Sequence, residues 1–202
     1  MVIYTTMCLY SYKQFIGESR QSIDNICKKY GIEDYTINDD GTVDVDGHVN
    51  LIGRNLDKLP LRFGKVTGNF DCVNNKLTSL EGSPYSVGGY FYCNGNKLTS
   101  LEGCPYKMGG NFYCRNNQLT SLEGFSELYR DGMKVHINNN PVDEVYKLFD
   151  NIKAINIINE WEVIDVENMA VSYLRLSEVF KELGLEVPSR ESIEFKHYTL
   201  VG

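Results

Sequence analysis

Six cysteines and three histidines carry the most reactive side chains in this sequence of 202 residues. Half of the cysteines recur at intervals of 21 residues: Cys72, Cys93 and Cys114. Zinc sites need cysteines from short Cys-x-x-Cys loops that fold around one point, and this spacing provides no such loop. The histidines, His48, His136 and His197, belong to no recognisable nucleophile or metal motif. We therefore predict that the protein is not an enzyme and uses no catalytic residue, metal or cofactor.

The evenly spaced cysteines belong to an internal repeat, which decides how the rest of the chain is interpreted. Its clearest copies read GNFDCVNNKLTSLEG from Gly68, GGYFYCNGNKLTSLEG from Gly88 and GGNFYCRNNQLTSLEG from Gly109. They share the pattern apolar-x-apolar-x-x-Asn-x-Leu-x-x-Leu. Its apolar positions recur 21 residues before the first copy, from Val49, and 23 residues after the third copy, up to Val145. We therefore predict five stacked units, with the extra length of the last unit at Tyr129–Gly132.

Each unit has the pattern of one short strand followed by a turn. Side chains alternate between the two faces of a strand, so Phe91 and Cys93 point one way while Tyr92 and Asn94 point the other. Cysteine occupies a position that is apolar in every unit, which predicts a small core residue. The Asn after the strand can bond backbone groups and stack on the next Asn, and Arg54 replaces it in the first unit. The Gly-rich and Pro-rich stretch that follows predicts an irregular or extended back.

At these positions the chain resembles the leucine-rich repeat family, whose units place leucines at the same spacings around an Asn or a Cys. The resemblance implies a horseshoe solenoid in which one parallel strand from each unit lines the concave face. Residues 35–145, with their LTSLEG units, also resemble the short-repeat proteins frequent in tailed bacteriophages. That likeness implies a phage protein in the host cytoplasm, which binds or inhibits a host protein such as a defence component.

The predicted fold class is α+β, a leucine-rich-repeat-like solenoid of about five short repeats with a parallel sheet. Residues 1–48 are expected to form an N-terminal cap of a helix and a hairpin. Residues 49–145 are expected to form the solenoid, and residues 146–202 a helical C-terminal cap. Stacking supplies the core of such a fold, and each end needs a cap because its last apolar face has no neighbour.

Apolar spacing and turn residues predict the elements of the two caps. Helical spacing predicts a helix over Glu18–Tyr30, and alternation around Asp40–Gly41 predicts a hairpin. A short helix is expected within Pro141–Asp150, where the chain leaves the last unit. Apolar residues in steps of three and four predict an amphipathic helix from Asp165 to Leu183. The closing stretch from Ser192 alternates like a strand.

The charge and hydropathy of the chain limit the classes of partner. A formal net charge of −7 argues against nucleic acid, because binding to phosphate backbones usually needs a basic stripe. A membrane-spanning helix needs a run of about 18 apolar residues, and the sequence contains no such run. The first twenty residues also lack the pattern of a signal peptide. We therefore expect a cytoplasmic protein with reduced thiols.

The predicted binding site lies on the outward side chains of the concave face, which the core does not need. Tyrosine and arginine gathered there are typical of interface hot spots. The predicted partner-binding residues are Asp71, Tyr90, Tyr92, Asn94, Tyr113, Arg115 and His136. An alternative is binding of a nucleotide or small anion by Arg115, Lys134 and His136. A further alternative is a structural homo-oligomer that associates through the caps or through Tyr85 and Tyr106 on the back.

Overall fold

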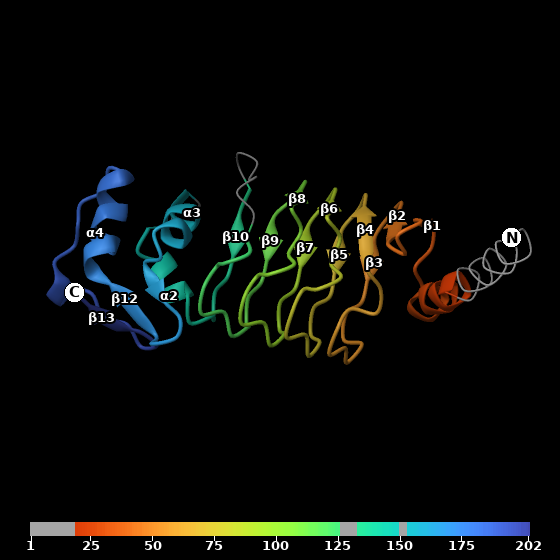
Figure 1. Ribbon diagram of the computed structural model, residues 1–202, viewed down its shortest axis with the longest axis horizontal. Coiled ribbons are helices and arrows are strands. Elements are labelled where there is room, and N and C mark those ends of the chain that lie inside the picture. Colours follow the sequence, from red (N-terminus) through yellow and green to blue (C-terminus); the bar gives the residue numbers. More distant parts are fainter. Residues whose placement is uncertain (1–18, 126–132, 150–152) are drawn as a thin grey trace, which may run out of the picture.

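The computed structural model describes residues 19–125, 133–149 and 153–202 of the chain. Figure 1 shows turns of extended chain stacked side by side in one row. Helical residues 19–30 lie at one end of the row and the C-terminal helices lie at the other. The molecule is therefore an α+β repeat solenoid with a few helices at its ends, as predicted.

One strand from each predicted unit contributes to a five-stranded parallel sheet, which we call the front sheet. In spatial order its strands are β3 (Val49–Asn50), β5 (Phe70–Asp71), β7 (Phe91–Tyr92), β9 (Phe112–Tyr113) and β10 (Val135–His136). The first residue of each strand pairs with the first residue of the next, so all five units share one register. The predicted repeat spacing is confirmed, including the longer last step. Tyr129–Gly132, the predicted place of the two extra residues, lies outside the described residues.

The N-terminal hairpin and the backs of the first three units form a second five-stranded sheet, which we call the back sheet. Its strands are β1 (Tyr35–Ile37), β2 (Val43–Val45), β4 (Phe63–Val66), β6 (Ser86–Val87) and β8 (Lys107–Met108). The first two form the predicted antiparallel hairpin, and the other pairs are parallel. The back is therefore extended.

Aromatic rings and thiols fill the space between the two sheets. Fully buried rings stack along the axis at centroid distances of 5.4 and 5.8 Å, from Phe70 through Phe91 to Phe112. The repeated cysteines are also fully buried, which confirms their predicted core position. Burial raises the pKa of the Cys72 and Cys93 thiols well above the ordinary range. These thiols stay protonated, whereas metal binding and nucleophilic attack need the thiolate.

A buried asparagine ties each unit after the first to the turn before it: Asn75, Asn96, Asn117 and Asn140. The side-chain oxygen of Asn96 accepts a hydrogen bond from the backbone N–H of Leu77 at 3.0 Å. Its Nδ2 donates to the carbonyl oxygens of Cys72 and Cys93, at 3.0 and 3.1 Å. Leu77 and Cys72 belong to the preceding turn, so one amide satisfies backbone groups of two turns. The other three asparagines make equivalent bonds.

The direction of these bonds explains why the first unit lacks the asparagine. Each buried amide reaches back to the turn that precedes it, and the first unit has no earlier repeat turn to reach. An asparagine at that position would therefore lose its main partners. Arg54 occupies the position and is exposed. The departure from the pattern follows from the position of the unit at the end of the stack.

Helical residues 19–30 cap the first turn, as predicted. Ile23, Ile26 and Tyr30 pack against the core, and Cys27 is fully buried. Gly31 adopts a left-handed conformation with φ of 66°, which ends the helix at the predicted place. Glu18, the first residue of the predicted helix, lies outside the described residues. An amphipathic helix thus covers the apolar end that stacking leaves open.

The first half of the helix predicted over Asp165–Leu183 is wrong. The structure instead contains β11 (Ile164–Asp165) and β12 (Ala170–Ser172), and α4 spans Tyr173–Glu182. A carboxylate oxygen of Asp165 accepts hydrogen bonds from the backbone N–H groups of Glu167 and Asn168, which sets a turn between the strands. The Ser172 hydroxyl then caps the helix by accepting from the Arg175 N–H at 3.3 Å. These local side-chain bonds outweigh the helical spacing of the apolar residues.

The rest of the C-terminal segment has a small core of its own. The predicted short helix is present as α2 (Asp143–Tyr146), and α3 (Lys153–Glu160) was not predicted. Only β13 (Thr199–Val201) of the predicted closing strand forms, after the 3-10 turn Arg190–Ser192. The buried residues of this core come from α2, α3, β12, α4 and the segments between and after them: Val145, Phe149, Ala154, Ile158, Val163, Val171, Leu176, Val179, Phe180, Ile193 and Tyr198. The segment also contacts the fourth repeat unit, where the Tyr198 hydroxyl donates a hydrogen bond to the Thr120 carbonyl at 2.7 Å.

The buried amides should contribute a large part of the stability of the stack. Replacing Asn96 with Ala leaves the Leu77 N–H without its partner in the interior, while the Cys72 carbonyl keeps the bond from Asn75. An unpaired buried group costs about 1–3 kcal/mol, so we expect a loss of about 2 kcal/mol in the free energy of unfolding. Urea denaturation measures this loss. Lys97→Ala, a change at the adjacent exposed side chain, is the control and should cost less than about 0.5 kcal/mol. Equal effects of the two variants would contradict the role of the amide.

Candidate interaction surface

The register of the front sheet brings four of the predicted site residues into one line. Asp71 pairs with Tyr92, Tyr92 with Tyr113, and Tyr113 with His136. All four side chains point away from the core because the residues before them in each strand point inward. We call these four residues the central column. Each of them is half-buried.

Three rings of the central column stack directly on one another. The centroids of the Tyr92 and Tyr113 rings are 4.9 Å apart with an angle of 20° between the planes. The Tyr113 and His136 rings follow at 4.5 Å and 11°. Because the rings stack along the solenoid axis, their inner faces cover one another and their edges face outward. The stack therefore holds the side chains in fixed positions before any partner arrives.

Tyr90 widens this stack into a patch. Its side chain is 40% exposed, and its ring centroid lies 5.9 Å from that of Tyr92 and 6.2 Å from that of Tyr113. The amide of Asn111 also donates a hydrogen bond to the Tyr113 hydroxyl at 3.3 Å. The patch thus combines aromatic surface with polar groups at its margin, which suits contact with a partner that is itself partly polar.

Arg115 lies beside the column and fixes the state of His136. Its Nη2 is 3.0 Å from Nδ1 of His136. A guanidinium group can only donate, so Nδ1 must accept and carries no proton. Burial lowers the pKa of His136, and the charges of Arg115 and Lys134 lower it further. His136 is therefore neutral at neutral pH. Of the three residues in the anion-binding alternative, Arg115 and Lys134 then carry the positive charge.

The structure shows a contact of Asn94 that was not predicted. Its side-chain oxygen accepts a hydrogen bond from the Arg115 N–H of the next turn at 2.8 Å. Asn69 and Asn111 make the same lateral bond to the turns that follow them. The amide of Asn94 therefore connects two turns at the surface. Sequence analysis missed this role, although asparagine recurring at outward positions could have indicated it.

The Asp71 carboxylate is the unusual group in the column. One of its oxygens accepts a hydrogen bond from the backbone N–H of Val73 at 3.0 Å. Burial raises the pKa of this carboxyl group above its ordinary value, and the bond from Val73 opposes only part of that shift. Within the described ranges Asp71 takes part in no salt bridge. The column thus carries a partly desolvated negative charge without a counter-charge.

A second pair of stacked tyrosines lies on the back of the solenoid. The Tyr85 and Tyr106 rings are 5.3 Å apart, at an angle of 17° between their planes. These side chains are 57% and 43% exposed. They immediately precede the back strands β6 and β8, so they lie on a different wall from the central column. This pair matches the column in ring spacing, which makes it a useful control surface.

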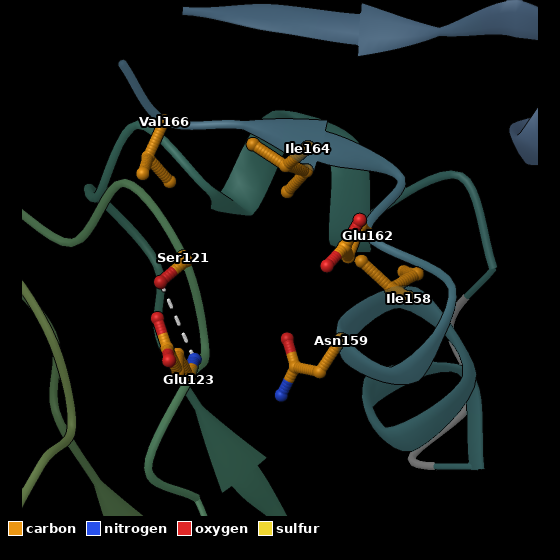
Figure 2. Close-up of a pocket in the computed structure, with 7 residues that line it drawn as sticks. All are labelled: Ser121, Glu123, Ile158, Asn159, Glu162, Ile164 and Val166. Carbon is orange, nitrogen blue, oxygen red and sulfur yellow. Dashed lines mark hydrogen bonds between the residues drawn. The ribbon is translucent and has the colours of Figure 1, made fainter.

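A cleft of about 220 Å³ lies between the end of the fourth repeat unit and the C-terminal segment. Figure 2 shows the side chains that line it. Its lining consists of Ser121, Glu123, Ile158, Asn159, Glu162, Ile164 and Val166. Asn159 donates from α3 to the Leu122 carbonyl at 2.9 Å, and the Ser121 hydroxyl accepts from the Glu123 N–H at 3.3 Å. The Asn159 bond joins the C-terminal segment to the repeat, and the Ser121 bond is local to one turn of the repeat. None of the predicted site residues lines the cleft.

The described residues contain neither a candidate metal site nor a membrane-spanning helix. In residues 19–125, 133–149 and 153–202, no group of three or more His, Cys, Asp or Glu side chains could hold a metal ion. Within the same ranges, none of the helices has the length and apolar character needed to cross a bilayer. Comparisons of the chain with protein-family models, curated proteins and solved structures found no match.

The contact between Arg115 and His136 predicts a measurable titration. In Arg115→Ala the pKa of His136 should rise toward its ordinary value of about 6.5, because a nearby positive charge is removed. The rise should be incomplete, since burial is the larger cause of the lowered pKa. An NMR titration of the His136 ring measures this directly. Lys134→Ala should give a smaller rise, and an unchanged pKa in Arg115→Ala would contradict the contact.

The raised pKa of Asp71 predicts a pH-dependent effect on stability. A folded-state pKa above the unfolded value means that ionisation of Asp71 costs stability as the pH rises. Asp71→Asn should therefore melt at a higher temperature than the parent at neutral pH. This difference in melting temperature should vanish at about pH 3. Asp165 provides the opposite case because its hydrogen bonds lower its pKa, so Asp165→Asn should melt earlier at neutral pH. A lower melting temperature for Asp71→Asn would contradict the assignment.

Proposed function

We propose that this protein is a non-catalytic binding module that holds a protein partner on its front sheet. The ring stack of Tyr92, Tyr113 and His136 carries this proposal, with Tyr90 and Arg115 beside it. The core uses the inward residues of the same strands, so nothing in the packing of the solenoid requires aromatic rings on the outer face. Repeat scaffolds use such outward positions to present side chains to a partner.

The stack has the physical properties of an interface hot spot. Tyrosine and arginine are enriched at the few positions that contribute most of the binding energy. Ordering such side chains on binding normally costs about 0.5–1.5 kcal/mol each. Stacking at 4.9 and 4.5 Å has already restricted these rings in the free protein. The column can therefore bind with little additional loss of side-chain entropy.

The shape of the surface favours a macromolecular partner. The column crosses the strands of an open sheet, while small ligands are usually enclosed in concave pockets. The net charge of −7 makes a nucleic acid an unsuitable partner for this face. A folded protein or an extended peptide can cover an open sheet face of this kind. The front sheet is thus best suited to a protein surface.

The proposal that the partner is a host protein has a separate basis. It rests on the resemblance of the LTSLEG units to the short-repeat proteins of tailed bacteriophages. In that setting a binding module without catalytic groups would act by occupying a host protein, for example a defence component. The binding role of the front sheet does not depend on this part of the proposal.

Affinity purification from host extract, read by mass spectrometry, tests the proposed function. Tyr92, Tyr113 and Arg115 replaced together by Ala should reduce capture of a specific protein by about tenfold or more, because hot-spot residues dominate binding energy. The control is Tyr85→Ala with Tyr106→Ala, which removes the stacked pair from the back sheet. It should leave capture unchanged. Equal capture by the parent and the triple variant, or loss only in the back variant, would contradict the proposal.

A further inference from the structure

The negative charge of Asp71 is not required by the fold. Asn50 occupies the same register position one turn earlier, opposite Asp71 in the front sheet. The Asn50 side-chain oxygen accepts from the Ile52 N–H at 3.1 Å, and that of Asp71 accepts from the Val73 N–H at 3.0 Å. A neutral amide therefore makes the same local bond. The local turn therefore does not explain why position 71 carries a carboxylate.

Holding that charge is costly in the free protein. Asp71 is half-buried, and its pKa is raised by desolvation. It takes part in no salt bridge among the described residues. Arg115 is two strands further along, where it contacts His136. A partly desolvated charge that the fold neither needs nor compensates is typical of a functional position.

An aromatic ring face lies next to this carboxylate. Tyr113 covers one face of the Tyr92 ring. The opposite face is turned toward the preceding turn, where Asp71 is the register partner of Tyr92. The carboxylate is near enough to help raise the pKa of the Tyr92 hydroxyl, although burial and the neighbouring tyrosines contribute more. The end of the ring stack thus presents a π surface and a negative charge at one place.

We propose that Asp71 and the face of the Tyr92 ring turned toward it form a receptor for a cationic side chain, an ammonium or guanidinium group of the partner. This inference rests on the proposed function, because it takes the partner to be a protein. A cation placed there gains an ion pair with the carboxylate and a cation–π contact with the ring. Ile52, which is 44% exposed, and half-buried Val73 follow on the same outer face and offer apolar surface to the methylene stem.

Other classes of group fit this position less well. An anion would be repelled by Asp71. A neutral apolar group would desolvate the carboxylate further without providing a counter-charge, which is strongly unfavourable. A lysine or arginine side chain both satisfies the carboxylate and covers the ring. Recognition at this end of the column therefore selects partners by charge, while the rest of the stack supplies contact area.

NMR titration of the full chain with single amino-acid derivatives tests the receptor without a known partner. The probes are N-acetyl-arginine amide and N-acetyl-lysine amide, and the neutral control is N-acetyl-norleucine amide. We expect the cationic probes to shift the backbone signals of Asp71, Tyr92 and Val73, and the neutral probe to leave them unchanged. Asp71→Asn should weaken the cationic probes about fivefold or more, since the amide keeps the turn and removes only the charge.

A second variant separates the ring from the charge. Tyr92→Leu keeps an apolar side chain and should weaken the cationic probes about threefold, whereas Tyr85→Leu on the back sheet should have no effect. Shifts that are absent, or that are equal in the parent and Asp71→Asn, would overturn the inference. If capture of a protein depends on the tyrosines but the probes fail, the cation receptor alone is wrong. If the probes bind as expected and no protein is captured, the receptor stands and the proposed function is wrong.

Discussion

The buried asparagine that follows each front strand is the interaction on which the rest of this structure depends. The front strands are short, so backbone N–H and carbonyl groups beyond their ends need hydrogen-bond partners outside the strand ladder. The Asn96 amide satisfies such groups in its own turn and in the one before it, away from water. A buried amide with these partners has only one acceptable position. It therefore fixes how each turn sits on the previous one and, with that, the register of both sheets.

This register determines the core and the outer surface together. Because side chains alternate along a strand, a slip of one residue would turn Phe91 outward and Tyr92 into the core. The same alignment that stacks the buried phenylalanines also stacks the tyrosines on the outer face. The inward positions repeat because all turns share one core, while the outward positions are free to change from turn to turn. The front sheet can thus carry a charge at Asp71 and a cation at Arg115 without any change in the scaffold.

The sequence predicts those features of this fold that depend on repetition. Five units, the core cysteines and the line from Asp71 to His136 all follow from the spacing. The back strands β4, β6 and β8 could not be specified, because the stretches that form them are short and rich in Gly and Pro. The late start of the C-terminal helix depends on side-chain bonds at Asp165 and Ser172, which periodicity does not reveal. The lateral role of Asn94 and the uncompensated charge of Asp71 likewise depend on neighbours that only the folded chain defines.

The amide-fixed register aligns Tyr92, Tyr113 and His136 in one ring stack on the outer face. Ring-to-ring nuclear Overhauser effects in solution measure that alignment. We expect cross-peaks between the Tyr92 and Tyr113 rings and between the Tyr113 and His136 rings. We also expect a separate set among the buried phenylalanines. Cross-peaks from the Tyr92 ring to the buried phenylalanine rings, or no contact between the Tyr92 and Tyr113 rings, would contradict the register and the surface built on it.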